Sequence, residues 1–140
     1  MKLNIKEEDY LETIYRLSRN EGFVRISEIA RAREVRLPTV ISAISRLKEN
    51  DLVRQEYYGK VSLTPAGKKM GAKIYKTHRI LRIFFDEVLG LPHEISEDNA
   101  CRMEHGANRE IVRRLEALTE AMRLPGGNSM PHRPAARRGR

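Results

Sequence analysis

The sequence predicts a mainly α-helical fold with one small β-hairpin, and it divides the chain into two parts of different character. Apolar residues recur at helical spacing over most of the chain. Residues 52–57 and 60–63 instead alternate between apolar and polar side chains on either side of a Tyr-Gly turn, which is the pattern of a hairpin. The charge also changes along the chain. Residues 1–80 hold 17 Lys/Arg against 10 Asp/Glu, whereas residues 81–124 hold 6 against 9.

The length and composition limit the class of protein. A chain of 140 residues with 40% hydrophobic content is large enough for one domain, or for two small domains that share a core. Its single cysteine excludes an internal disulfide and suits a reducing compartment. No run approaches the roughly 18 apolar residues of a membrane span, and the first residues lack the apolar region of a signal peptide. We therefore expect a cytoplasmic protein that does not enter a membrane.

Three helices are expected before the hairpin. The first covers residues 7–19, where the apolar side chains have helical spacing. The second is short, with Ser27 as its N-cap. After a break at residues 33–37, Pro38 is well suited to the first turn of a third helix, which ends at about Asn50. The apolar positions of this third helix are Val40, Ile41, Ile44 and Leu47.

This order of helices, tight turn and hairpin is that of a winged helix-turn-helix, whose third helix enters the major groove of DNA. The basic N-terminal part favours polyanion binding, although a basic solvated surface without a function is the alternative. The third helix offers hydroxyl groups and cations but no Asn or Gln for a bidentate adenine contact, so we expect DNA shape to supply part of the selectivity. The residues predicted to bind DNA are Arg36, Pro38, Thr39, Ser42, Ser45, Arg46 and Lys60.

The second half of the chain is predicted to be helical throughout. A long helix opened by residues 64–67 continues to about Leu89, another begins near Ser96, and a third covers about residues 108–123. Their apolar side chains are too many for so small a helical layer to bury alone, which predicts a homodimer interface. These side chains are Ile80, Ile83, Phe84, Val88, Leu89, Ile111, Val112, Leu115, Leu118 and Met122. Residues 125–140 are rich in Pro, Gly and Arg and are predicted to form a disordered basic tail.

Cys101, Glu104 and His105 form the most specific chemical pattern in the chain. Their spacing of i, i+3 and i+4 predicts three potential metal ligands on one face of a helix. Near neutral pH each has a metal-binding form: thiolate, carboxylate and neutral imidazole. Further candidate ligands lie elsewhere in the chain: Asp9, Glu12 and His78. We therefore predict a divalent-metal site assembled from three separate segments.

Each of these ligands also has a purely structural interpretation. A lone cysteine is usually a small buried residue, Asp9 and Glu12 fit a solvated helix face, and His78 fits a buried core position. Two other classes of protein stay open. One is a metal-free winged-helix regulator that binds DNA or RNA, and the other is a small metallohydrolase with Glu104 as general base. The short chain and the lack of a substrate-pocket signal oppose the hydrolase, so we do not expect an enzyme.

Four motifs carry a resemblance to a known protein family. They are EDYLETIY at residues 8–15, LTPAG at 63–67, HRIL at 78–81 and ACRMEH at 100–105. Over about residues 5–122 the chain resembles the diphtheria-toxin-repressor family of metal-dependent transcriptional regulators. The resemblance implies a winged-helix DNA-binding domain over residues 1–73 and a helical metal-binding and dimerisation domain over residues 74–124, with a divalent metal between them. A homodimer in turn predicts a near-palindromic double-stranded operator, because the site mirrors the two-fold symmetry of the protein.

The resemblance implies a mixed set of metal ligands. Asp9 and Glu12 match the carboxylates of the manganese-responsive branch, whereas Cys101 matches the iron-responsive branch. The remaining ligands are common to both branches: His78, Glu104 and His105. A thiolate favours Fe²⁺ over Mn²⁺, and carboxylates have the opposite effect. We predict a repressor of metal-homeostasis genes that responds to Fe²⁺, with Mn²⁺ as the alternative.

The iron-responsive branch has a second metal site, which this chain matches incompletely. That site needs a carboxylate four residues after His78, where this chain has Arg82. It also needs a histidine four residues before Cys101, where this chain has Glu97. We predict that Arg82 and Glu97 form an ion pair in place of the second metal.

Overall fold

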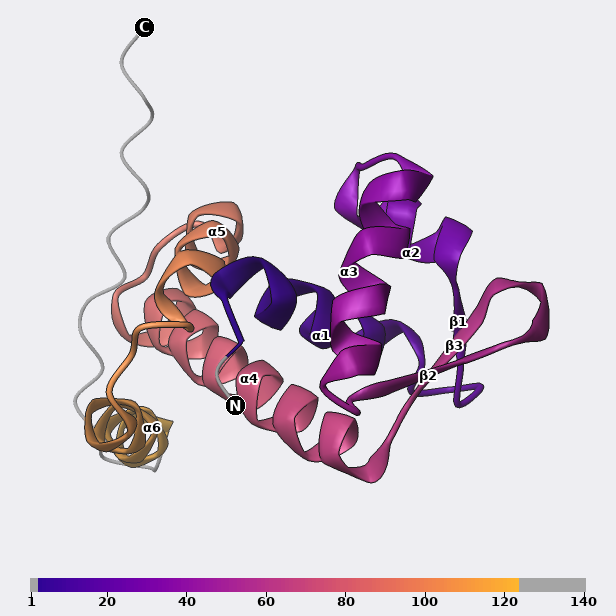
Figure 1. Cartoon of the computed structure of the whole chain (residues 1–140). Coiled ribbons are helices and arrows are strands. Elements are labelled where there is room, and N and C mark those ends of the chain that lie inside the picture. Colours follow the sequence, from indigo (N-terminus) through magenta and orange to yellow (C-terminus); the bar gives the residue numbers. More distant parts are fainter. Residues whose placement is uncertain (1–2, 124–140) are drawn as a thin grey trace, which may run out of the picture. The chain divides into compact units, whose positions relative to one another are not determined.

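The computed structural model describes residues 3–123, and the chain divides into a first compact unit that ends at Tyr75 and a second that begins at Lys76. The division lies inside the long helix α4 (Pro65–Ile83), which contributes residues to both units (Figure 1). The predicted fold class is confirmed: the elements are helices and one small antiparallel sheet. The predicted tail, residues 125–140, lies outside the described residues. Within the described part, no helix combines the length and the apolar composition needed to cross a membrane.

Helix α1 (Ile5–Leu17) begins with a closed capping box. The side chain of Asn4 accepts a hydrogen bond from the backbone N–H of Glu7 at 2.8 Å, and the Glu7 carboxylate accepts one from the backbone N–H of Asn4 at 3.1 Å. Two of the N–H groups that every helix start leaves unsatisfied are thereby paired. This cap defines the start of the helix that carries Asp9 and Glu12.

Helix α2 (Ile26–Arg33) begins differently from the prediction. Arg25, and not Ser27, is its N-cap residue. The carboxylate of Glu28 accepts a hydrogen bond from the backbone N–H of Arg25 at 3.3 Å, so a side chain inside the first turn closes the cap. The helix ends at Arg33, and its C-cap residue Glu34 has a φ of 55°, in the left-handed region, which turns the chain toward the next helix.

Helix α3 (Leu37–Glu49) has Pro38 in its first turn, as predicted. Its buried side consists of Val40, Ile44 and Leu47. Ile41 was predicted together with these apolar positions, but it is 53% exposed. The reason is geometric: each residue advances about 100° around a helix, so Ile41 lies well away from the centre of the buried side.

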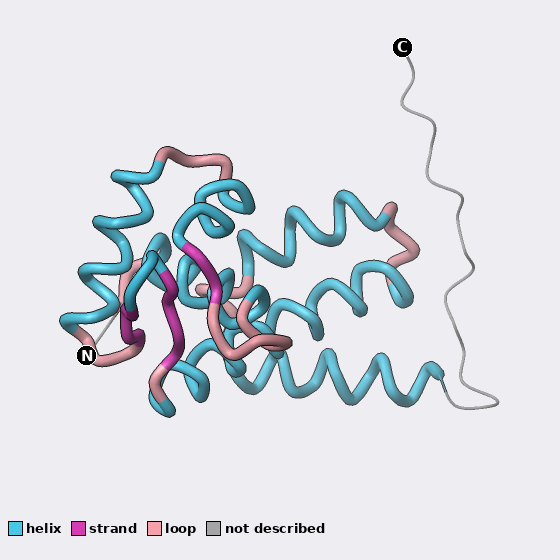
Figure 2. Tube along the Cα trace, turned by 90° about the vertical axis from the view of Figure 1, so that its right-hand side faces the viewer, coloured by secondary structure: helices cyan, strands magenta, loops and turns pink. Residues whose placement is uncertain are grey.

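The sheet has three antiparallel strands in the order β1-β3-β2, drawn in magenta in Figure 2. The predicted hairpin is confirmed as β2 (Val53–Glu56) and β3 (Lys60–Leu63), joined by the 3₁₀ turn η1 (Tyr57–Gly59). The short strand β1 (Val24–Arg25) pairs with the other side of β3 and extends the hairpin prediction by one strand.

The three helices and the sheet enclose the core of the first unit. Fully buried side chains come from every layer of this core: Leu11, Ile14, Val24, Ile29, Val40, Leu47 and Val61. Two glycines of α4 lie close to neighbouring elements of the same unit. A Cβ atom at Gly67 would meet the backbone of Leu52, and one at Gly71 would meet the side chain of Tyr15.

The second unit begins with the C-terminal part of α4, which continues into one π-helical stretch, η2 (Phe84–Val88). Gly90, with a φ of 65°, then redirects the chain. Helix α5 (His93–Met103) begins after Pro92, three residues before the predicted start at Ser96. It ends at Met103, so the prediction that a single helix holds Cys101, Glu104 and His105 is wrong. Helix α6 (Arg109–Arg123) is the last described element.

A small apolar cluster holds the second unit together. Leu81 and Phe85 pack with Ala100 of α5 and with Leu115 of α6. A bidentate ion pair supports this packing, because both terminal oxygens of Glu87 accept hydrogen bonds from Arg123 at 2.6 Å. The hydrogen bonds from Arg123 lower the pKa of the Glu87 carboxyl below its usual value, against the opposing effect of partial burial.

Candidate metal centre and nucleic-acid interface

The first group of predicted ligands lies on α1, in the first unit. Asp9 and Glu12 are one helical turn apart, so they share one face of the helix. Oδ2 of Asp9 lies 3.5 Å from Nη2 of Arg33, and Oε1 of Glu12 lies 3.8 Å from Nε of Arg16. The Glu12 side chain is only 5% exposed, whereas that of Arg16 is 42% exposed. Both carboxylates therefore have a cation near them, and Glu12 is a buried acid.

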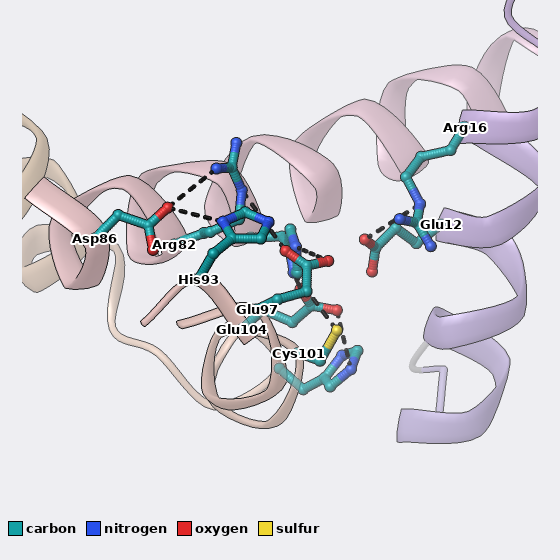
Figure 3. Close-up of polar contacts among 10 residues, drawn as sticks. Glu12, Arg16, Arg82, Asp86, His93, Glu97, Cys101 and Glu104 are labelled. Carbon is teal, nitrogen blue, oxygen red and sulfur yellow. Dashed lines mark hydrogen bonds and ion pairs between the residues drawn. The ribbon is translucent and has the colours of Figure 1, made fainter. Parts of the chain in front are cut away.

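The second group surrounds His78 of α4, in the second unit. The imidazole is 3% exposed, and both of its nitrogens meet carboxylates: Nδ1 lies 2.7 Å from Oε2 of Glu104, and Nε2 lies 3.0 Å from Oε1 of Glu97. Sγ of Cys101 lies 3.7 Å from Nδ1. Figure 3 shows Glu97, Cys101 and Glu104 directed toward one another. Three residues predicted as metal ligands, His78, Cys101 and Glu104, thus lie together in this unit.

The end of α5 positions the rest of this group. Glu104 is the C-cap residue and keeps right-handed helical dihedral angles, so its side chain still follows Cys101 by about one turn. His105 lies in the turn that follows, with Nε2 at 3.3 Å from Oε1 of Glu104. The spacing of i, i+3 and i+4 therefore brings these side chains near each other without a continuous helix.

The acidic groups around His78 favour its protonated, positively charged form. Burial disfavours its charged form, but hydrogen bonds with Cys101 and Glu104 and the negative charge of Glu97 outweigh burial and raise the pKa of His78 to about 11. Without a metal, the imidazole is therefore protonated at neutral pH and donates to both carboxylates. A proton on His78 thus supplies positive charge that the cluster requires.

The donor set fits a divalent transition metal. Ligand atoms of His78, Glu97 and Cys101 lie within 4.8 Å of one another. Nitrogen and sulfur ligands at about 2.0–2.3 Å from one ion lie up to about 4.5 Å apart, so small side-chain shifts are sufficient. Oε1 of Glu104 is buried and accepts no hydrogen bond from the described residues. An imidazole, carboxylates and a thiol beside an unsatisfied oxygen are the donors that such an ion prefers.

The predicted ion pair between Arg82 and Glu97 is confirmed, with Nε of Arg82 at 3.6 Å from Oε2 of Glu97. Arg82 also reaches Asp86, whose Oδ2 lies 3.4 Å from Nη1 (Figure 3). His93 shares the same Asp86 oxygen, with Nδ1 at 3.1 Å. A guanidinium thus lies between two carboxylates at the edge of the cluster, and it occupies one oxygen of Glu97 while His78 contacts the other.

Glu97 is the residue of this site whose role the sequence pattern missed. It was predicted only as the ion-pair partner of Arg82, but it also contacts His78 directly. The sequence did contain one indication that Glu97 belongs to the site: Glu97 precedes Cys101 by four residues and therefore shares a face of α5 with it. The sequence contains no comparable signal for the distance to His78, which depends on how α4 and α5 pack.

The residues predicted to bind DNA lie in the first unit, on α3 and at the start of β3. Six of them are exposed: Arg36, Pro38, Thr39, Ser42, Ser45 and Arg46. Lys60 is half-buried, with Nζ 4.5 Å from the centre of the Phe23 ring. Nη1 of Arg46 lies 3.5 Å from Oε1 of Glu7, the acid of the α1 capping box. The recognition surface therefore holds two cations that already have partners within the unit.

Two family profiles match the chain in succession. Residues 2–61 match the N-terminal DNA binding domain of the iron dependent repressor, and residues 64–132 match its metal binding and dimerisation domain.

Individual relatives extend this finding. The diphtheria toxin repressor of Corynebacterium glutamicum is 34% identical over 126 residues, which are 89% of this chain and 55% of the relative, so the chain spans about half the length of that protein. The HTH-type transcriptional regulator MntR of Bacillus pumilus is 31% identical over 113 residues, which are 81% of this chain and 78% of the relative. Among solved structures, the IdeR of T. acidophilum has a TM-score of 0.74 at 28% identity, over 97% of this chain and 65% of that chain.

Proposed function

Because the chain belongs to the diphtheria-toxin-repressor family of metal-dependent transcriptional regulators, we propose that it is a repressor that binds operator DNA as a homodimer when it holds Fe²⁺. Its target genes would then be genes of metal homeostasis. One observation carries the proposal: His78 lies buried between Glu97 and Glu104 with the thiol of Cys101 beside it. A buried cluster with two carboxylates and a thiol around one imidazole needs a cation. The relatives in this family are regulators that respond to divalent metals.

The proposed ligands come from both halves of the chain: Asp9, Glu12, His78, Cys101, Glu104 and His105. Without metal, the carboxylates of each half are balanced by cations of the same half, Arg33 and Arg16 in the first and protonated His78 in the second. The DNA-binding halves of the dimer then have no metal that attaches them to the rest of the protein. A metal bound by both groups would hold the two recognition helices at one separation, so that less ordering cost remains when DNA binds. Linkage makes the effect reciprocal, and operator DNA should tighten metal binding by the same factor.

The preference for Fe²⁺ rests on Cys101. A thiolate is a soft ligand that favours iron, zinc, cobalt or nickel, whereas Asp9 and Glu12 are hard ligands that suit Mn²⁺. A set with one thiolate and several carboxylates lies between these preferences, and Mn²⁺ is therefore the alternative. Two branches of one family, iron-responsive and manganese-responsive, correspond to these two choices.

The direct test is metal analysis of protein purified without oxygen, followed by DNA binding with each ion in turn. We expect iron to copurify, a chelator to remove operator binding, and added Fe²⁺ to restore it. Restoration by Mn²⁺ at a lower free concentration than Fe²⁺ would establish a manganese-responsive regulator instead. DNA binding that is unaffected by the chelator would identify a metal-free winged-helix regulator.

Metal binding should release a proton from His78, because the metal binds only the neutral imidazole and the pKa of this residue is about 11 without metal. Below that pH, the metal affinity should rise with pH by up to about tenfold per unit through this residue alone. Calorimetry in two buffers of different ionisation enthalpy measures the proton count. The His78→Gln protein should release about one proton fewer, whereas His93→Gln, which replaces an exposed histidine outside the ligand set, should release as many as the parent. Equal release by both variants would contradict the assignment.

The Arg46→Ala and Lys60→Ala proteins should bind every DNA duplex more weakly and depend less on salt. Each change removes a proposed phosphate contact, and the slope of log affinity against log salt should fall in magnitude by about 1. The Ser42→Ala protein should instead change the preference among sites. Arg113→Ala is the matched control, because it removes an equal charge from an exposed position on α6. An unchanged salt slope in the first two variants would show that the proposed DNA surface is wrong.

The chain should be a dimer at micromolar concentration, because α6 exposes apolar side chains that its own unit does not cover. Ile111 is 58% exposed and Leu118 is 47% exposed, and their separation of seven residues places both on one side of the helix. Sedimentation equilibrium should give a dimer for the parent and for Leu17→Glu, a similar change on α1. The Ile111→Glu/Leu118→Glu protein should be monomeric with an unchanged helical content. A dimer in that variant would place the interface elsewhere.

A further inference from the structure

Two large apolar side chains of α3 lie on its surface. Leu37 is 50% exposed and Ile41 is 53% exposed, whereas the other large apolar residues of this helix are buried. Leu37 and Ile41 are four residues apart, so they form one apolar stripe at the N-terminal end of α3. Packing within the first unit leaves about half of each side chain uncovered, so the stripe is available to another molecule.

The surroundings of the stripe favour an anionic partner. Arg36 precedes it directly, and Lys48 lies seven residues after Ile41 on the same side of the helix. Helix α3 contains no acidic residue before Glu49, its last residue. Lys48 also lines a shallow cavity with Gln55, Glu56 and Tyr57 of the hairpin, so a basic and an aromatic group continue beyond the stripe, beside one acid. An apolar surface among cations fits a ligand that is anionic overall but has apolar groups.

Duplex DNA has such groups in its major groove. The C5 methyl of thymine is the apolar group that base pairs present there, and an α-helix fits this groove. Residues 37–49 contain no Asn or Gln, so the bidentate contact that usually reads adenine is not available from α3. An A·T pair can then be recognised through its thymine methyl.

We propose that Leu37 and Ile41 read thymine by packing against its C5 methyl groups in the major groove of the operator. This inference rests on the proposed function. It assigns sequence selectivity to two residues that are not among the residues predicted to bind DNA. Each contact removes a methyl group and part of an aliphatic side chain from water. The loss of one methyl should lower the affinity by about threefold to fivefold, from the value of about 0.8 kcal/mol per buried CH₂.

Deoxyuridine tests this proposal, because it differs from thymidine only by the missing methyl. A duplex is first selected from a random pool by the full-length protein with Mn²⁺, which is stable in air. Each thymine of the selected duplex is then replaced singly by deoxyuridine, and the affinity is measured by fluorescence anisotropy. We expect a loss of about threefold to fivefold at one or two positions in each half-site.

The variants assign the effect to residues. Leu37→Ala or Ile41→Ala should bind the thymine duplex as weakly as the parent binds the deoxyuridine duplex, and should no longer distinguish the two at one position. Both side chains are half exposed, so circular dichroism should show an unchanged fold. Leu17→Ala, a similar change at the 42% exposed end of α1, should retain the full preference for thymine.

The outcomes separate this inference from the proposed function. In one outcome the protein selects a duplex in a metal-dependent way, and deoxyuridine at every position leaves the affinity unchanged. This result would show that the stripe does not recognise thymine, and it would leave the proposed repressor function intact. A thymine preference that persists in both alanine variants would do the same, and would leave the stripe as a surface for a protein partner. If no duplex is enriched with Mn²⁺ or, in the absence of oxygen, with Fe²⁺, the proposed function is wrong, and the proposed role of the stripe is wrong with it.

Discussion

The Asp9→Ala protein should lose most of its response to metal while keeping weak, metal-independent affinity for DNA. In the proposed mechanism Asp9 is one of the two ligands from the DNA-binding half, and the metal acts by fastening that half to the rest of the dimer. Coupling of this kind is typically worth about 1–3 kcal/mol, or roughly 5–150-fold in affinity. The expected result is therefore a variant in which added Fe²⁺ changes operator affinity by less than about fivefold.

The matched control for this prediction uses the ion-pair partner of the same residue. Asp9 lies 3.5 Å from Arg33, so Asp9→Ala removes an ion pair as well as a ligand. Arg33→Ala removes the same ion pair and keeps the ligand, and it should retain the metal response. Operator affinity is measured for both variants by anisotropy titration with and without Fe²⁺, in the absence of oxygen. A full metal response in Asp9→Ala would exclude the mechanism in which both halves share the metal.

The Gly67→Ala protein should be strongly destabilised, by about 3 kcal/mol or more in the free energy of unfolding. Alanine normally stabilises a helix relative to glycine by about 1 kcal/mol, so the expected sign is the reverse of the intrinsic preference. The cause is steric. A Cβ atom at this position would lie 1.9 Å from the carbonyl oxygen of Leu52 and 2.9 Å from its carbonyl carbon. Backbone atoms cannot move aside as the end of a flexible side chain can.

The backbone around Gly67 is held by several hydrogen bonds, which limits how far it can relax. The Leu52 carbonyl accepts a hydrogen bond from the backbone N–H of Thr64, and the hydroxyl of Thr64 accepts one from the backbone N–H of Gly67, both at 3.0 Å. Relief of the overlap would therefore break the start of α4. Urea denaturation followed by circular dichroism measures the change. Gly106→Ala is the control, because no atom lies within 4 Å of its added Cβ, and its stability should stay close to that of the parent.

The metal centre shows where sequence patterns succeed and where they fail. Spacing within one segment predicted that Cys101 and Glu104 act together, whereas the pair of Arg82 and Glu97 was predicted from the resemblance, because both residues replace ligands of the family's second metal site. The same reasoning was wrong about the helix, which ends at Met103. Helix ends depend on capping and on the packing of the following turn, so the position of a motif is easier to predict than the extent of the element that carries it.

The surface of α3 shows a similar division. The periodicity of the helix predicted a buried side and an exposed side, and Val40, Ile44 and Leu47 are buried accordingly. Ile41 was placed with them because hydrophobic character alone suggests burial. Whether a residue at the border of the apolar side is covered depends on the elements packed beside the helix, and these elements come from elsewhere in the chain. The exposure of Leu37 and Ile41 is therefore a property of the tertiary structure.

By itself, the sequence determined the order of the helices and the hairpin, the basic character of the first half, and the donor types available for a metal. These features depend on side-chain spacing and charge within short segments, where each residue acts on near neighbours. Only the tertiary structure decided that His78 lies between Glu97 and Glu104 with both ring nitrogens engaged. Burial lowers its pKa, but the contacts with Cys101, Glu104 and Glu97 outweigh burial and raise it to about 11. His78 and Glu104 are 26 residues apart, and their distance of 2.7 Å results from the packing of α4 beside the end of α5. The periodicity of one helix contains no information about this distance, because the distance is set by the packing of all the helices of the second unit against one another.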